Sequence, residues 1–331
     1  MSVDLDIKAA AAAPGLRFLL LGHPVDHSLS PAMHNAAFRH LGIEAHYEVL
    51  DIPDTTGLPA AVDLLRHRPY AGANVTIPHK VAVLDLVDEV TPRARRVGAV
   101  NTIIPEDGGR LTGDNTDGYG LLTAIAEAAT PANRGVTGAA PLAVGNGRLR
   151  AGRRDIRRVV MFGAGGAARG CLVALADAGA AQVTLVARSP ERALAMAGTV
   201  TLPPGTRVGV LPWPTNRSTS GEAVWTAITE ADFVLNTTPL TGGGEAGDPI
   251  LSLAQFAALR QVNPSCLLGD MVYRPALTAF LRPWAAAGGA VVTGLSVLLH
   301  QGAESFRLWL GRPAPVGVMA VAIGITRTTN V

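Results

Sequence analysis

The 331-residue sequence has little charge, few aromatic side chains and only two cysteines. Charged residues make up 16% of the chain, and 28 Lys and Arg against 26 Asp and Glu leave a formal net charge of +2. This balance argues against a protein that binds nucleic acid or another polyanion, because such a protein carries a clear basic excess. Cys171 and Cys266 cannot form a disulfide framework in a chain of this length, so we expect a reducing, cytoplasmic location.

The sequence also lacks a long hydrophobic run. No apolar stretch reaches the roughly 18 residues that a membrane-spanning helix needs, although the mean hydropathy is +0.27. Asp4 and Asp6 precede Lys8 at the start of the chain, a charge order unlike that of a signal peptide, and we expect residues 1–14 to be a frayed extension. A hydrophobic content of 48% excludes a disordered chain. Because domains usually have roughly 100–200 residues, the length of this chain predicts about two domains.

Short apolar strands alternate with helical segments along most of the chain. Strands are predicted near residues 17–21, 46–50, 73–76, 99–104, 159–162, 182–187, 231–236, 266–271 and 290–293. Between the first two, Ser30 is the predicted N-cap of a helix, Pro31 its first residue and Gly42 its end. The alternation predicts an α/β protein with mostly parallel sheets covered on both faces. Residues 130–157 are rich in Gly, Ala and Arg without periodicity, which favours a solvated surface loop over an anion or partner contact.

A glycine-rich turn follows one of these strands. Gly163, Gly165 and Ala168 form a G-x-G-x-x-A pattern between the strand ending at Phe162 and the start of a helix. In a dinucleotide site the first glycine permits the tight turn, the second lets the backbone approach the pyrophosphate, and the small third residue allows close helix–strand packing. The helix N-terminus offers N–H groups to the phosphates. The alternative is a structural strand–helix turn without a ligand.

The end of the next strand predicts which nicotinamide cofactor is used. NAD sites usually place an acidic residue there for the ribose 2′-hydroxyl, but this strand ends at Ala187 with no acid. Arg188 and Arg192 could pair with a 2′-phosphate, with Ser189 donating a hydrogen bond. Arg192 equally suits a solvated helix position. Glu191 is the one residue whose charge disfavours a 2′-phosphate, but it lies past the turn. We therefore predict NADP(H) rather than NAD(H).

Polar side chains gather where strands of the first half should end. They supply hydroxyl, amide, ammonium and carboxylate groups, which suit a small, polyhydroxylated, anionic substrate bound at the carboxyl ends of the strands; they are Ser28, Ser30, Asn74, Thr76, Lys80, Asn101 and Asp117. Each has a structural alternative when taken singly. Ser30 would also suit a helix cap, Thr76 an ordinary strand position, and Lys80 the surface.

These residues lie in longer motifs: GHPVDHSLSPAMHN, GANVTIPHK, GAVNTI, GDNTDGYG, FGAGGAARG, NTTP, GDMVYRPALTAFL and GLSVLLHQGAESF. In this order, from about Phe18 to about Met319, the chain resembles the shikimate dehydrogenase family. The resemblance implies a substrate domain of residues 1–118 and 295–331, a Rossmann-type NADP-binding domain of residues 119–294, and an active site in the cleft between them. It also implies reversible, NADP-linked reduction of 3-dehydroshikimate to shikimate.

The resemblance assigns roles to individual residues. Lys80 and Asp117 match the catalytic pair, and Ser28 and Ser30 match the serines that hold the substrate carboxylate, with Tyr273 nearby. Positions that contact ring hydroxyls match Asn74, Thr76, Asn101 and Gln301. The cofactor-binding candidates are Gly163, Ala164, Gly165, Gly166, Ala167, Ala168, Arg188, Ser189, Arg192, Thr237, Met271 and Gly294, the last close to the nicotinamide. Two positions depart from the family pattern: Ala187 replaces the common Asn at the NADP turn, and Arg274 follows Tyr273.

The chemistry of such a site needs only the cofactor and one acid–base pair. The nicotinamide carries the hydride, while Lys80 gives a proton to the developing alkoxide in reduction and removes it in oxidation, oriented by Asp117. Scattered histidines show no ligand spacing, so we predict no metal. The expected partner is the small-molecule substrate, with no nucleic acid and no membrane; a monomer and a homodimer both stay open. Alternatives are a quinate or aminoshikimate dehydrogenase of the same superfamily, or a non-catalytic nucleotide-binding sensor.

Overall fold

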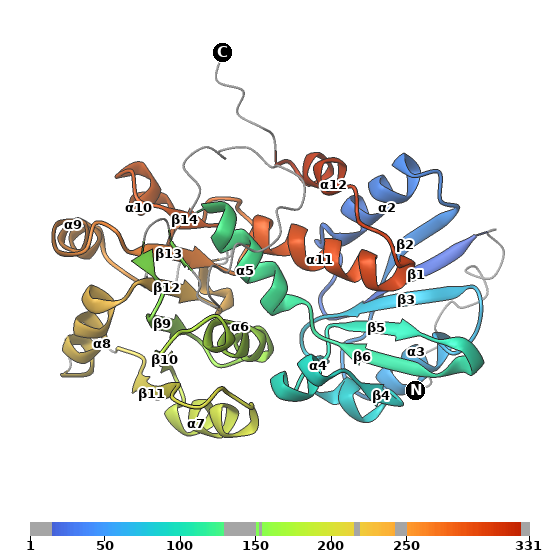
Figure 1. Cartoon of the computed structure of the whole chain (residues 1–331), viewed down its shortest axis with the longest axis horizontal. Helices are drawn as coiled ribbons and strands as arrows, with labels where there is room; N and C mark the ends of the chain where they lie inside the picture. Colours follow the sequence, from blue (N-terminus) through green and yellow to red (C-terminus); the bar gives the residue numbers. More distant parts are fainter. Residues whose placement is uncertain (1–14, 129–149, 152–153, 215–218, 242–249, 326–331) are drawn as a thin grey trace, which may run out of the picture. The chain divides into compact units, whose positions relative to one another are not determined.

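The computed structural model describes residues 15–128, 150–151, 154–214, 219–241 and 250–325 (Figure 1). The expected extension at 1–14 and most of the expected loop at 130–157 lie outside the described residues. The chain divides into two compact units. Unit 1 comprises Met1–Thr116 and Gly302–Gly324, and unit 2 comprises Asp117–Gln301 and Ile325–Val331.

Unit 1 is built around a mixed six-stranded sheet. Its strands are β1 (Leu16–Gly22), β2 (Ala45–Asp51), β3 (Tyr70–Val75), β4 (Glu89–Val90), β5 (Thr102–Pro105) and β6 (Leu111–Asp114). They lie in the order β2-β1-β3-β5-β6-β4, and β5 runs antiparallel to both of its neighbours while the other pairs are parallel. The α-helices of this unit are α2 (Ser30–His40), α3 (Leu58–Leu64), α4 (Pro92–Val97), α12 (Val316–Ala322) and the second part of α11 (Gly294–Leu310).

Two local predictions for unit 1 need correction. The N-cap of α2 is Leu29, not Ser30, and the side chain of Leu29 makes no capping hydrogen bond. The reason is that Ser28 Oγ accepts the backbone N–H of Ser30 at 3.2 Å, so Ser30 enters the first helical turn. The strand expected at 99–104 begins only at Thr102, although the backbone of Asn101 is already bonded to Asp114 and Val75 in the neighbouring strands.

Unit 2 contains a fully parallel six-stranded sheet. Its strands are β9 (Arg158–Phe162), β10 (Gln182–Ala187), β11 (Arg207–Pro212), β12 (Phe233–Asn236), β13 (Leu267–Asp270) and β14 (Val291–Val292), in the order β11-β10-β9-β12-β13-β14. Numbered from β9, this is the 3-2-1-4-5-6 order of a Rossmann-type sheet. The α-helices are α5 (Asp117–Ala128), α6 (Gly166–Asp177), α7 (Pro190–Thr199), α8 (Thr219–Glu230), α9 (Leu253–Val262), α10 (Arg282–Ala286) and the first part of α11.

The unit 2 sheet buries both of its faces. Val159 and Met161 pack in one core cluster, with side chains of α5 and α6, whereas Val160 and Phe162 pack in a second, with side chains of α8, α9 and α10. Successive strand residues point to opposite faces, so a continuous apolar run such as Val159–Phe162 marks a strand covered on both sides. Helices therefore cover both faces of the sheet, and the α/β fold class expected from the sequence is confirmed.

The expected loop at 130–157 contains some regular structure. β7 (Arg150–Ala151) and β8 (Arg154–Asp155) pair antiparallel, where the composition had predicted only an irregular surface segment. Two-residue strands are too short to show a period in the sequence, so composition alone could not reveal them. Among the described residues, no helix has both the length and the apolar character to cross a membrane.

Candidate active site

The carboxyl ends of β9 and β12 form the switch point of the unit 2 sheet, where a parallel sheet of this kind binds its ligands. Gly163 leaves β9 with φ +103°, and a Cβ atom there would lie 2.6 Å from Thr237 Oγ1. Thr237 follows β12 and donates from its backbone N–H and its hydroxyl to the carbonyl of Phe162, at 2.8 and 2.7 Å. Backbone conformation and crowding therefore both require glycine at position 163.

The first turn of α6 is open at its N-terminus. Gly165 is the N-cap and no side chain caps the helix. Nothing lies within 4 Å of the place where a Cβ of Gly165 would stand, while Ala168 in the same first turn is completely buried in the core. The turn thus combines space, backbone N–H groups and the positive end of a helix dipole, which together suit an anionic group such as a pyrophosphate.

The turn after β10 carries the residues expected to meet a 2′-phosphate. Ser189 is the N-cap of α7, and its Oγ accepts from the backbone N–H of Arg192 at 3.4 Å. The same hydroxyl donates to Glu191 Oε2 at 3.1 Å. Arg188 and Arg192 are both exposed. A phosphate at this turn would meet two accessible guanidinium groups but would compete with Glu191 for the serine.

Asp270, at the end of β13, is a site-building residue that the sequence reasoning missed. Its side chain is completely buried and accepts hydrogen bonds from Asn236 Nδ2 at 2.9 Å, Thr278 Oγ1 at 2.6 Å and the backbone N–H of Val272 at 3.0 Å. These bonds pin the segment that carries Met271 and Tyr273. An acidic residue that ends a buried apolar strand was the available signal, since such a charge needs several donors.

Gly294 supports the same segment from the start of α11. A Cβ at this position would collide with the carbonyl group of Val272 and would lie 2.7 Å from the carbonyl oxygen of Met271. The helix can therefore approach this backbone only through a residue without a side chain. Met271 and Gly294, two of the cofactor-binding candidates, are neighbours in unit 2.

The strand ends of unit 1 bring several of the predicted substrate residues together. Thr76 donates its backbone N–H to Leu21 at the end of β1, at 2.8 Å, and a side chain at Gly22 would collide with the Thr76 methyl group. The backbone carbonyl of Lys80 accepts from Val100 at 2.8 Å, next to Asn101. Main-chain hydrogen bonds thus hold Thr76, Lys80 and Asn101 at one edge of the sheet.

Asn74 and Asn101 belong to a buried hydrogen-bonded network. Tyr47 donates its hydroxyl to Asn74 Oδ1 at 2.9 Å, and Asn74 Nδ2 donates to the carbonyl of Asn101 at 3.1 Å. Asn101 Oδ1 accepts the backbone N–H of Thr116 at 2.8 Å. Both amides are at least 95% buried, so their orientations are set by the protein and not by solvent.

An ion pair between a half-buried arginine and a buried aspartate fixes the segment that precedes Asp117. Arg93 Nε and Nη2 donate to the two carboxylate oxygens of Asp114 at 3.0 and 2.7 Å, and Thr91 Oγ1 donates at 2.7 Å. Burial by itself would raise the pKa of the Asp114 carboxyl, but the hydrogen bonds from Arg93 and Thr91 hold this pKa below its usual range. Arg93 also lies 3.6 Å from Glu304 on α11.

Two more of the predicted residues lie together in unit 2. Asp117 is the first residue of α5, and Gly120 on the first turn of this helix has no room for a side chain, because a Cβ would lie 2.8 Å from Gln301 Cβ. Gln301 therefore packs directly on the turn that Asp117 begins. Tyr273 is half-buried in the same unit, whereas Ser28 and Ser30 lie in unit 1, after β1.

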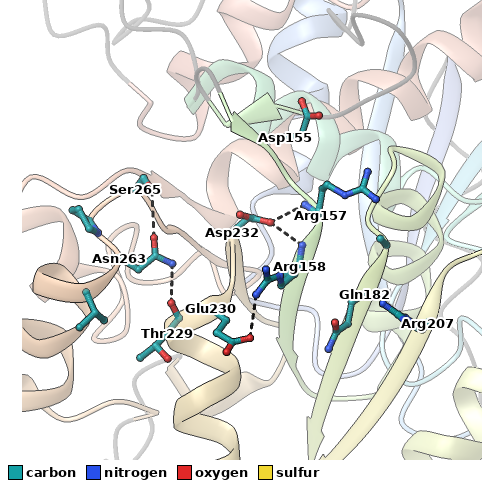
Figure 2. A pocket seen from close by; sticks show the side chains of 13 residues that line it. Asp155, Arg157, Arg158, Gln182, Arg207, Thr229, Glu230, Asp232, Asn263 and Ser265 are labelled. Carbon is teal, nitrogen blue, oxygen red and sulfur yellow. Dashed lines mark hydrogen bonds and ion pairs between the residues drawn. The ribbon is translucent and has the colours of Figure 1, made fainter.

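A cavity of about 880 Å³ lies at the opposite, amino-terminal edge of the unit 2 sheet (Figure 2). Its lining contains three arginines and three acidic residues, from the segments before or at the start of β9, β10 and β11 and around the ends of α8 and α9. Asp232 accepts the backbone N–H groups of Arg157 and Arg158, and Arg158 pairs with Glu230 at 3.0 Å. Its charges balance and it lies away from the glycine turn, so this cavity is not the candidate site.

Among the described residues, no three His, Cys, Asp or Glu side chains are grouped as a metal ion would require. The Rossmann order of unit 2, its glycine turn and the polar strand ends of unit 1 define the class: an α/β dehydrogenase with a nucleotide-binding unit and a second, substrate-type unit.

Comparison with protein families narrows this class. Residues 20–103 match the shikimate dehydrogenase substrate binding domain, and residues 294–322 match the shikimate 5′-dehydrogenase C-terminal domain. A shikimate dehydrogenase (NADP(+)) of Symbiobacterium thermophilum is 39% identical over 315 residues, which cover 95% of this chain and 96% of that protein. The chain belongs to the shikimate dehydrogenase family, and the resemblance seen in its motifs is confirmed.

Solved structures show the same relationship. The shikimate 5-dehydrogenase of Thermus thermophilus, in complex with NADP(H) and shikimate, is 35% identical with a TM-score of 0.70, covering 93% of this chain and 98% of that one. A quinate dehydrogenase of Corynebacterium glutamicum in complex with NAD has a TM-score of 0.74 at 25% identity, with the same coverage. The fold is therefore shared by enzymes named for different substrates, and the substrate must be argued from side chains.

Proposed function

We propose that this chain catalyses the reversible, NADP-dependent reduction of 3-dehydroshikimate to shikimate. One observation supports the proposal: in a chain 39% identical to an NADP-dependent shikimate dehydrogenase, the backbone carbonyl of Lys80 is bonded to Val100, next to Asn101, whose own carbonyl is bonded to Asn74. In this proposal unit 1 binds the substrate and unit 2 binds the nucleotide. A cytoplasmic location and a monomeric or homodimeric state belong to the same proposal.

The cofactor candidates suit a phosphorylated dinucleotide. The open first turn of α6 would receive the pyrophosphate, and the exposed guanidinium groups of Arg188 and Arg192 would receive the 2′-phosphate. Thr237, Met271 and Gly294 would line the path toward the nicotinamide. When bound, the nicotinamide supplies the hydride in reduction and takes it up in oxidation.

Lys80 is the proposed acid and base. During reduction its protonated Nζ would give a proton to the oxygen that becomes the alcohol, and during oxidation its neutral amine would take that proton back. Asp117 would orient the ammonium group. Ser28, Ser30 and Tyr273 would hold the substrate carboxylate, while Asn74, Thr76, Asn101 and Gln301 would bind the ring hydroxyls. Each ring hydroxyl would then meet a donor or acceptor held in place by the protein.

The basic residues of the chain add support for Lys80. The sequence contains 26 arginines and only two lysines, Lys8 and Lys80. Arginine serves as well as lysine for most surface and ion-pair roles, but its very high pKa prevents it from acting as a base near neutral pH. The presence of a lysine at position 80 in so arginine-rich a chain therefore supports a role in proton transfer.

This shortage of lysines allows a sharp experiment. Lys80→Ala and Lys80→Arg should both lower kcat for shikimate oxidation by about 100- to 10,000-fold, with a much smaller change in KM, because neither variant can accept the proton. Lys8→Arg is the matched control and should retain wild-type kinetics. If Lys80→Arg turned over at a near-normal rate, Lys80 would be only a charge partner and the proposed mechanism would be wrong.

A quinate dehydrogenase is the second candidate, because the C. glutamicum enzyme shares the fold. The pair Ser28 and Ser30 favours shikimate, and Arg188 disfavours an NAD-linked enzyme. Comparing shikimate with quinate in the wild-type protein separates the two candidates.

A further inference from the structure

The hydroxyl of Ser305 lies at the centre of the polar network of unit 1. Ser305 is on α11, and its side chain is completely buried. Its Oγ lies 3.0 Å from Asn74 Nδ2, 2.9 Å from Thr102 Oγ1 and 3.2 Å from Thr116 Oγ1. One helical side chain therefore contacts β3, β5 and the segment after β6.

The direction of these hydrogen bonds can be worked out from the backbone groups at each end. Asn74 Nδ2 faces the backbone carbonyl of Asn101, which can only accept, and the Tyr47 hydroxyl donates to Asn74 Oδ1. The amide of Asn74 is thus oriented with its nitrogen toward Ser305. The same nitrogen also lies 3.3 Å from Thr102 Oγ1, but Ser305 Oγ is the nearer hydroxyl. An amide nitrogen cannot accept, so Ser305 Oγ accepts from it and its own proton is left to donate onward.

The other end of the network is fixed in the same way. The backbone N–H of Thr116 can only donate, so the atom of Asn101 that faces it at 2.8 Å is Oδ1. Thr102 Oγ1 donates to this oxygen at 2.9 Å. Ser305 donates to Thr102 in turn, and the hydrogen bonds run in one direction from Asn74 through Ser305 and Thr102 to Asn101. Bonds in such a chain strengthen one another.

We propose that Ser305 is a positioning residue, which sets the orientation of the Asn74 and Asn101 amides and so controls how strongly the site distinguishes substrates by their ring hydroxyls. The inference rests on the proposed function, in which these two amides bind hydroxyl groups. Ser305 itself would not touch the substrate. It follows Gln301 by one helical turn, so α11 would contribute one direct contact and the support for two others.

Removing the hydroxyl takes away one of the links between the two amides and leaves the direct bond from Asn74 Nδ2 to the Asn101 carbonyl and the longer bond from Asn74 Nδ2 to Thr102 Oγ1. In Ser305→Ala the Asn74 amide loses an acceptor, and Thr102 loses the donor that directs its own proton toward Asn101. A site that holds polar groups in fixed positions rejects an analogue lacking the matching hydroxyl, and a loosened site loses this discrimination. Loss of one net hydrogen bond corresponds to roughly a tenfold weakening for the substrate that used it.

The test compares binding of shikimate with binding of its 4-deoxy and 5-deoxy analogues, by isothermal titration calorimetry on the full chain. Ser305→Ala should weaken shikimate about tenfold and should leave at least one deoxy analogue within about twofold of wild type. Ser296→Ala is the matched control, because Ser296 is on the same helix and donates to Glu127 at 3.1 Å, away from the network. Ser296→Ala should leave the affinity for shikimate and for both analogues unchanged.

A merely structural role for Ser305 would weaken shikimate and both analogues by the same factor, and this result would overturn the proposal, as would no change at all. The side-chain amide protons of Asn74 and Asn101 give an independent reading by NMR without ligand. They should exchange slowly in the wild type and at least tenfold faster in Ser305→Ala. If the wild type failed to bind shikimate, the proposed function would fall, while unaltered amide exchange would overturn the role of Ser305.

Discussion

Burial of the His34 imidazole should make the stability of the folded chain depend on pH. It lies on α2 with no exposed surface, stacked on Tyr47 at 4.6 Å between ring centroids and close to the rings of Trp309 and Phe306. Neither ring nitrogen has a hydrogen-bond partner in the described structure. Burial lowers the pKa of His34 from 6.5 to about 3, because the imidazolium would be charged in an apolar site.

This lowered pKa makes folding sensitive to acid in a defined window. Between pH 6.5 and 3 the unfolded chain binds a proton at His34 that the folded chain does not, so stability is present above this window and is lost as the pH falls through it. Lowering the pH from 8 to 5 should reduce the free energy of unfolding by about 2 kcal/mol through His34 alone. With a urea m-value of about 2 kcal/mol per molar, the unfolding midpoint should move by about 1 M.

The assay is urea unfolding of the wild type and of His34→Leu at pH 8 and pH 5, followed by circular dichroism. The wild-type midpoint should fall by about 1 M more than that of the variant. His67→Leu removes an exposed histidine of the same unit and is the control. Equal shifts for wild type and His34→Leu, or a titration of His34 near pH 6 in ¹³C NMR, would refute the reasoning.

The nucleotide site supports two further predictions. Gly163→Ala should weaken NADPH binding at least tenfold in a fluorescence titration, because φ +103° and the contact with Thr237 oppose a side chain, whereas Gly209→Ala, where a Cβ would meet nothing within 4 Å, should bind as the wild type does. Arg188→Ala should lower kcat/KM for NADPH by about tenfold or more without lowering it for NADH, since only NADPH carries the 2′-phosphate. Arg207→Ala, an exposed arginine at the far edge of the same sheet, should change neither; equal losses with both cofactors would count against the role of Arg188.

The parts of the fold that could be predicted are those coded locally. The strand expected at 182–187 is found as β10 with the same bounds, and the glycine turn lies between a strand and a helix as its pattern required. Both follow from short apolar runs bounded by Gly and from the conformation that only glycine adopts. A strand was also expected at 99–104 and is found as β5, but its antiparallel direction and its four-residue partner β6 were not predicted, because strands of this length carry too little periodicity in the sequence.

The side chains of the site divide in the same way. Asn74 near the end of β3, Lys80 after this strand and Asn101 just before β5 could be found from position and chemistry. Ser305 could not, because a serine within a helix reads as an ordinary polar residue until the sheet beneath it is known. The sequence also could not show that Ser30 is not the N-cap of α2. The backbone N–H of Ser30 is bonded to Ser28 Oγ, and the position of this oxygen depends on the path of the preceding loop.

The central claim is that this chain oxidises shikimate with NADP⁺. Its most direct test is to measure initial rates of the purified protein with shikimate and quinate, each with NADP⁺ and with NAD⁺. We expect the highest kcat/KM for shikimate with NADP⁺. A higher value for quinate or for NAD⁺, or no turnover with any of the four combinations, would contradict it.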